Sequence, residues 1–162
     1  MMQNSWAVAA TAAVLCLVLA AGCSQTVDLG QVSPAAAEAI KKTFPAASIT
    51  KATLESGGAL KLYEVGLAQG QQTMETTVSA EGQLVEVETV VALSEVPKPV
   101  EDAVTKAVGD GKLIKLEKVE HRGKVQAGKF VPLDPPEVFY EAKYVRWLIM
   151  HEVEWAPDGT VR

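Results

Sequence analysis

The sequence is poor in cysteine and histidine, with only two of each among its 162 residues. Cys16 lies in an N-terminal segment that we expect to be removed, so Cys23 alone would remain and no disulfide could form within the chain. No G-x-S-x-G elbow is present, and we expect neither a free thiol nor a second inward-facing histidine in the mature chain, so nothing pairs a nucleophile with a base. We therefore expect no enzymatic activity, no catalytic residues and no cofactor.

The chain also lacks an excess of positive charge. It has 15 Lys and Arg residues against 20 Asp and Glu residues, which gives a net charge of -5. Nucleic-acid binding depends on basic side chains that replace the counterions of phosphate groups, so we expect no nucleic-acid partner. Apolar residues make up 48% of the sequence, which is too many for a disordered chain.

Residues 1–22 contain no Asp, Glu, Lys or Arg, and this charge-free start is typical of a signal peptide. The apolar run at 7–21 is about 15 residues long, whereas a helix needs about 20 residues to cross a bilayer core. We therefore predict a cleaved signal peptide at 1–22. A transmembrane anchor is the alternative, at the short limit of length.

The segment that follows the apolar run is Leu19-Ala20-Ala21-Gly22-Cys23, which resembles the lipobox of bacterial lipoproteins. This resemblance implies a diacylglycerol on the sulfur of Cys23 and, after cleavage behind Gly22, an acyl chain on its amine. Several acyl chains on one residue anchor a protein firmly in a membrane. The predicted location is therefore the bacterial cell envelope, on the periplasmic or outer side of a membrane. An ordinary secretory signal, with Cys23 as a plain thiol, is the alternative.

The remaining chain is divided by its sequence patterns into a tether and two similar halves. Residues 24–33 are small and polar, so we assign 23–33 to the lipidated cysteine and a tether. Apolar spacing and capping residues predict helices at 34–44 and around 100–108. Alternating residues separated by short turns predict antiparallel strands at 49–55, 60–68, 72–79, 84–91, 112–122, 137–145 and 148–155.

Matched spacings indicate that the two halves are a repeat. Tyr63 precedes Gly82 by the same interval as Tyr140 precedes Gly159. We therefore predict repeats at 34–94 and 95–162, with extra residues at 123–136 in the second. Glycine and proline are dense in this insertion, which predicts a protruding loop without a regular ladder.

The repeat resembles the PepSY-like repeat that occurs in pairs in the beta-lactamase inhibitory protein and in bacterial lipoproteins. The matching residues are Phe44-Pro45, Tyr63-Glu64-Val65 and Glu81-Gly82 in the first copy, and Tyr140-Glu141 and Asp158-Gly159 in the second. The resemblance implies an α+β fold of two tandem repeats, each one helix packed on a three- to four-stranded antiparallel sheet. It also implies a location outside the cytoplasm and a role in binding proteins rather than in catalysis.

Period-two alternation separates two faces of the predicted sheet and places four carboxylates on the outer one. These are Glu64, Glu75, Glu86 and Glu88. Such a row is usually a solvated face, and we prefer this interpretation to a Ca²⁺ site, which needs 6–8 oxygens. We interpret His151 as a core residue, because its glutamate neighbours in a strand point to the opposite face, and we expect no metal site.

The second half contains the side chains best suited to binding a partner. Arg146-Trp147 takes the place of a hairpin turn without any turn-forming residue, and Trp and Arg are frequent in interface hot spots. The predicted partner-binding residues are Phe130, Phe139, Arg146, Trp147 and Met150. The alternative is that they pack within the chain.

Two functional hypotheses follow from these observations. The first is a membrane-anchored periplasmic lipoprotein that acts as a protein-binding module. Its partner would be an envelope peptidase or another periplasmic protein, and inhibition of a peptidase or other hydrolase is one version of this hypothesis. The alternative is a structural envelope lipoprotein with no inhibitory role.

Overall fold

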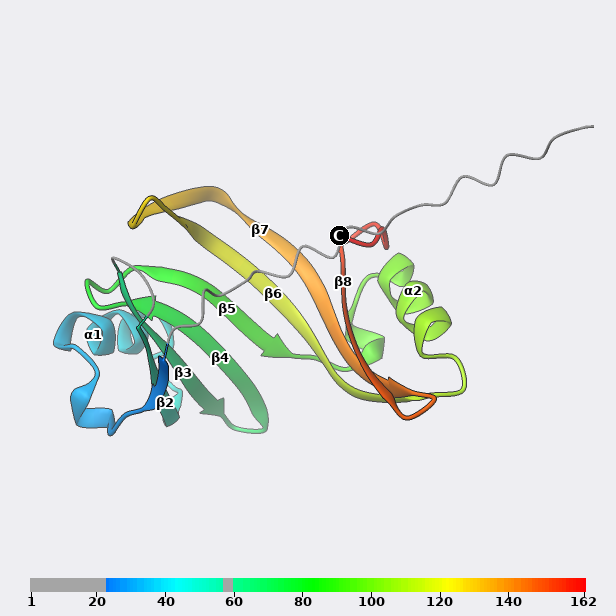
Figure 1. The fold of residues 1–162 in the computed structure, drawn as a ribbon, viewed down its shortest axis with the longest axis horizontal. Coiled ribbons are helices and arrows are strands. Elements are labelled where there is room, and N and C mark those ends of the chain that lie inside the picture. The colour runs from blue at the N-terminus through cyan, green and yellow to red at the C-terminus, as the bar shows by residue number, and fades with distance from the viewer. Residues whose placement is uncertain (1–22, 57–59) are drawn as a thin grey trace, which may run out of the picture.

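The computed structural model describes residues 23–56 and 60–162, which form one curved antiparallel sheet and two α-helices (Figure 1). The sheet has eight strands, and their spatial order β1 to β8 is the order in which they occur in the chain. The strands are β1 (Cys23–Thr26), β2 (Ser48–Ser56), β3 (Lys61–Gln69), β4 (Gln72–Ser79), β5 (Leu84–Val90), β6 (Lys112–Gln126), β7 (Lys129–Arg146) and β8 (Ile149–Trp155). The helices are α1 (Pro34–Thr43) and α2 (Lys98–Val108), with short 3₁₀ turns at Leu29–Gln31 and Leu93–Glu95.

The predicted fold of two repeats, each a helix on its own small sheet, is wrong. β5 pairs along its outer edge with β6, in a register that places Glu86 opposite His121 and Val90 opposite Glu117. An unpaired strand edge leaves N–H and C=O groups without partners, and the long strand β6 satisfies those of β5. Alternation in a sequence fixes which face a side chain takes, but it does not say which edges join.

Helix α1 begins where its sequence predicts and covers the first half of the sheet. The Ser33 hydroxyl accepts a hydrogen bond from the Ala36 N–H at 3.1 Å, and Pro34 fills the first helical position. Ala36 and Ile40 are buried against Val65, Leu67 and other apolar residues of β2 to β4. This packing fixes α1 over strands β2, β3 and β4.

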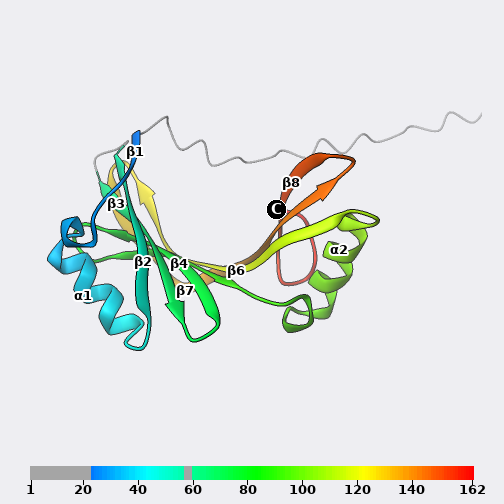
Figure 2. The ribbon, with the colours of Figure 1, turned by 90° about the horizontal axis from the view of Figure 1, so that it is seen from below.

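Helix α2 covers the second half of the sheet. It ends at Gly109, whose φ of 55° falls in the left-handed region that glycine adopts at helix ends. Val100 and Val104 are fully buried against Leu116, Ala142 and Trp155. The cross-strand registers place both helices on the same side of the sheet, and Figure 2 shows that this side is convex. The helix-free side is therefore concave.

Residues 123–136 form the end of a long β6–β7 hairpin, so the predicted protruding loop without a ladder is wrong. Gln126 pairs with Lys129 around a tight turn at Ala127 and Gly128, both with positive φ. The register shifts between the pair Gly123 and Pro132 and the pair His121 and Glu137. Pro135 and Pro136 lie in that irregular stretch, where a missing N–H removes no ladder bond. The hairpin arm extends the sheet beyond β5 (Figure 1).

The segment at 23–33, which we expected to be a tether, is partly structured. Residues 23–26 form β1 and pair with 53–56 of β2. Asp28 accepts a backbone hydrogen bond from Gln31 at 2.8 Å within the first 3₁₀ turn. The predicted signal peptide lies outside the described residues. Within the described residues, no helix is long and apolar enough to cross a membrane.

Candidate functional site

The concave face concentrates carboxylates because the strand registers place glutamates opposite one another. Glu75 of β4 lies opposite Glu88 of β5. Farther along the sheet, Glu117 of β6 lies opposite Glu141 of β7. Like charges directly opposite on neighbouring strands destabilise a sheet. Repulsion between these facing carboxylates therefore lowers the stability of the fold, and the packing of the sheet does not require it.

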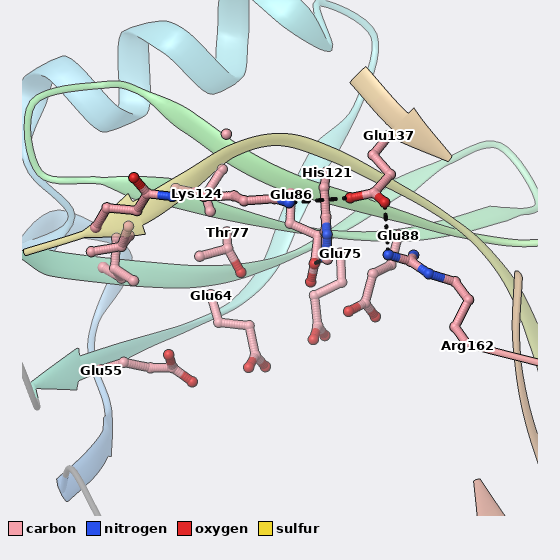
Figure 3. Close-up of a pocket in the computed structure, with 15 residues that line it drawn as sticks. Glu55, Glu64, Glu75, Thr77, Glu86, Glu88, His121, Lys124, Glu137 and Arg162 are labelled. Atoms are coloured by element: carbon pink, nitrogen blue, oxygen red, sulfur yellow. Dashed lines mark hydrogen bonds and ion pairs between the residues drawn. The ribbon is translucent and has the colours of Figure 1, made fainter. Parts of the chain in front are cut away.

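A pocket of about 640 Å³ lies on this face, between its glutamate rows and the β6–β7 arm (Figure 3). Figure 3 shows the carboxylates of Glu64, Glu75 and Glu88 pointing to the same side. The charged and titratable residues that line it are Glu55, Glu64, Glu75, Glu86, Glu88, Glu137, His121, Lys124 and Arg162. Six glutamates thus share the pocket with one lysine and one arginine.

The basic residues near the pocket pair with some of its glutamates and not with others. The Lys51 ammonium lies 3.3 Å from the Glu64 carboxylate and 2.6 Å from that of Glu75. On the opposite side, Lys124 and Arg162 both contact Glu137, at 3.6 and 2.9 Å. Among the described residues, no lysine or arginine forms an ion pair with the other lining glutamates, Glu55, Glu86 and Glu88.

Glu88 lines the pocket and has no ion pair with any described residue. The pKa of its carboxyl is raised to about 8, first by burial, then by hydrogen bonding to Glu86 and by the charges of Glu117 and Glu75. Glu88 is therefore largely protonated at neutral pH and can donate a hydrogen bond.

Beside the pocket, the rings of Phe139 and His121 form an aromatic floor on the concave face. Phe139 is only 2% exposed, because the Arg162 guanidinium lies 4.2 Å from its ring centre and the His121 ring packs edge-on at 4.7 Å. His121 also contacts the Glu86 carboxylate. Phe139 is thus covered by side chains of its own chain, and a partner would meet Arg162 and His121 first.

The β7–β8 turn stands at the other end of the sheet and exposes large apolar side chains. Trp147 and Leu148 occupy its two central positions with φ of 52° and 64°, values that usually require glycine or asparagine. Trp147 is 71% exposed and Leu148 98% exposed. Strain of this kind costs about 1–3 kcal/mol per residue and tends to occur at functional sites.

Arg146 holds the turn in place. Its guanidinium Nε lies 3.1 Å from an Asp110 carboxylate oxygen, and its Nη1 donates to the Ala107 carbonyl at 3.4 Å. The same guanidinium stacks over the Trp147 ring, 4.2 Å from the ring centre. The tryptophan is therefore both exposed and oriented, as an interface anchor needs to be.

The structure brings three of the predicted partner-binding residues together and separates the other two. Arg146, Trp147 and Met150 lie at the β7–β8 turn, where Met150 is 60% exposed. Phe139 is buried in the floor, and the Phe130 ring lies on the β6–β7 arm against Gly123. No group of three or more potential metal ligands occurs among the residues that the structure describes.

Solved structures with the same architecture come from species of Bacteroides. They include a BLIP-like protein of Bacteroides fragilis, with 16% sequence identity, a TM-score of 0.58, and coverage of 80% of this chain and 82% of that one. The fold is BLIP-like. A candidate periplasmic protein of Bacteroides eggerthii has 17% identity, a TM-score of 0.61 and coverage of 80% and 85%, respectively. A DUF2874 family protein of Bacteroides ovatus has 16% identity, a TM-score of 0.59 and coverage of 80% and 84%.

No family model matches the sequence, and no curated protein matches it. The likeness therefore concerns the BLIP-like fold, and the role of each residue rests on this chain's own geometry.

Two residues of the concave face were missed by sequence reasoning. Neither His121 nor Arg162 was assigned a role from the sequence. His121 reaches Glu86 only because β5 and β6 pair, and Arg162 reaches Phe139 after the turn that follows β8. Alternation along β6 places His121 on the same face as Glu117, which is the only sequence signal that points to it.

Proposed function

We propose that this protein is a lipid-anchored protein of the cell envelope that binds another protein through its concave sheet face. The observation that carries the proposal is a pocketed, helix-free face with six glutamates, three of which have no lysine or arginine partner among the described residues. A folded partner with basic side chains would relieve this repulsion, and such complementarity favours both fast association and specificity. The BLIP-like fold supports a binding role.

The β7–β8 turn supplies the apolar part of the proposed contact. Trp147 and Leu148 are exposed at the β7–β8 turn, so a partner that binds the concave face can also bury them. An envelope peptidase or other hydrolase is the class of partner that we favour, with inhibition as the consequence of its binding.

Site-specific photocrosslinking in living cells tests which face is used. A photoreactive residue at Thr77, which lines the pocket, should give an adduct with a partner. The same residue at Glu38, exposed on helix α1 of the convex side, is the control and should not. Adducts formed equally at both positions, or only at Glu38, would contradict the proposal. The hydrolytic activity of the identified partner, measured with and without this protein, then decides whether binding inhibits it.

We further propose that Cys23 carries the membrane anchor. Cys23→Ser should release the protein from the membrane fraction into the soluble fraction of the envelope and abolish labelling by radioactive fatty acid. The physical reason is that three buried acyl chains would be lost, each CH₂ contributing about 0.8 kcal/mol. Cell fractionation and labelling measure both effects, and Ser24→Ala is the control that should change neither. Full retention of the Cys23→Ser protein in the membrane fraction would refute the anchor.

A further inference from the structure

Strand β8 leaves part of its outer edge open. It pairs with β7 in an unbroken register from Arg146 opposite Ile149 to Tyr140 opposite Trp155. Beyond Trp155 the chain turns back, and Val161 forms an isolated bridge with Trp155. The edge between Ile149 and Val153 has no neighbour on its outer side among the described residues.

The hydrogen-bond alternation of an antiparallel pair identifies the free backbone groups on this edge. In a two-residue hairpin the residues that flank the turn exchange both bonds, so alternate residues of β8 point their N–H and C=O toward β7. Met150, Glu152 and Glu154 consequently point theirs outward. The Glu154 carbonyl is already occupied, since it accepts from the Arg162 N–H at 3.1 Å. Met150 and Glu152 are therefore the residues whose outward N–H and C=O groups are both open.

Natural proteins usually protect such an edge with proline, charged side chains, a bulge or a covering segment. Strand β8 has the sequence IMHEVEW, with no proline, lysine or bulge. Its charged residues are Glu152 and Glu154, and the Glu152 carboxylate lies 3.5 Å from the Lys143 ammonium of the neighbouring strand β7. Ile149 is 58% exposed beside Met150 and Leu148, so the edge is also bordered by exposed apolar side chains. An open edge with an apolar border favours pairing with another strand.

We propose that a second copy of this chain pairs with β8 in antiparallel orientation, with Met150 of each copy opposite Glu152 of the other. The open edge is self-complementary in this register. Each Met150–Glu152 pair exchanges two backbone hydrogen bonds, so the four N–H groups and four C=O groups that Met150 and Glu152 contribute in the two copies are all satisfied. No other register uses all of these groups without meeting the occupied Glu154 carbonyl.

The side chains agree with this register. Ile149 of one copy lies opposite Val153 of the other, which brings apolar side chains together at both ends of the ladder. The two Glu152 side chains do not lie opposite each other, and each already contacts its own Lys143 at 3.5 Å. The pairing has two-fold symmetry, which makes the contact isologous and closed at two copies.

A proline substitution on the open edge tests the proposal in solution. The exported Cys23→Ser chain carries no lipid and can be studied by sedimentation velocity over a range of concentrations. We expect a reversible dimer, and we expect Glu152→Pro in this background to raise its dissociation constant at least about tenfold, because an outward donor is lost from each copy. Glu152→Gln keeps that donor and is the matched control, so it should dimerise like the parent.

A cysteine scan tests the register even if the proline variant folds poorly. In the proposed pairing His151 lies opposite His151 of the second copy, at a non-hydrogen-bonded position where Cα atoms approach to about 4.5 Å and a disulfide can form. His151→Cys in the Cys23→Ser background should therefore give a disulfide-linked dimer on a non-reducing gel. Val153→Cys is the control and should not, because each Val153 lies opposite Ile149. A parent that stays monomeric up to about 100 μM, or equal cross-linking at 151 and 153, would overturn the proposal.

Discussion

Gly82→Ala is expected to lower the free energy of unfolding by about 3 kcal/mol or more. Gly82 follows β4 with φ of 84°, and a Cβ at this position would lie 2.7 Å from the Ala35 carbonyl oxygen in the first turn of α1. The strained backbone costs about 1–3 kcal/mol, and the contact with a fixed carbonyl adds to it. Relief of that contact requires α1 to move away from the sheet.

Gly70→Ala provides the matched control for this prediction. Gly70 also has a positive φ, 63°, but a Cβ there would meet nothing within 4 Å. Its substitution should therefore cost only the backbone component, about 1 kcal/mol. Urea denaturation of the two variants measures the difference. Equal losses of stability at both positions would mean that the approach of α1 to the Gly82 turn contributes nothing.

Glu88→Gln is expected to stabilise the protein at alkaline pH and to have little effect near pH 4. The pKa of Glu88 rises from an ordinary value near 4.5 to about 8 in the folded protein, mainly because of burial and then because of Glu86. Between these two values the folded chain binds more protons than the unfolded chain, so the free energy of unfolding falls as the pH rises from about 4.5 to about 8. Glutamine stays neutral and removes this loss.

The expected gain from Glu88→Gln is about 2 kcal/mol at pH 8 to 9, after allowance for the partial exposure of the side chain to solvent. Thermal or urea unfolding of parent and variant across pH 4 to 9 measures it. Glu38→Gln, on the exposed side of α1, is the control and should not change the shape of the pH profile. A difference between parent and Glu88→Gln that does not grow with pH would contradict the prediction.

The local elements could be predicted from the sequence because their signals are local. Ser33, Pro34 and Pro45 mark the ends of a helix that the structure has at Pro34–Thr43. Alternation likewise placed Tyr63 and Val65 against a helix and Glu64 on the opposite face. The joining of β5 to β6 was missed, because edge pairing depends on strand length and register between residues more than 25 positions apart, which alternation does not encode.

The candidate site was predictable only in part for the same reason. Trp147 was singled out because no turn-forming residue precedes β8, and the structure leaves it exposed with an unusual φ. Phe139 is of a residue type that is frequent at interfaces, but Arg162 and His121 cover it. Whether an aromatic side chain is free depends on what the rest of the chain places above it.

The sequential order of the strands also has a consequence for how the chain acquires its structure. Every strand pairs with the strand that precedes it, and most of these pairs are joined by short turns, so most contacts remain close along the chain. The two longer connections, β1–β2 and β5–β6, contain the helices α1 and α2. The apolar cluster under α1 is drawn entirely from residues before β5. A chain that emerges N-terminus first can therefore bury its first core while the second half is still extended, and β6 then adds to an edge that is already in place.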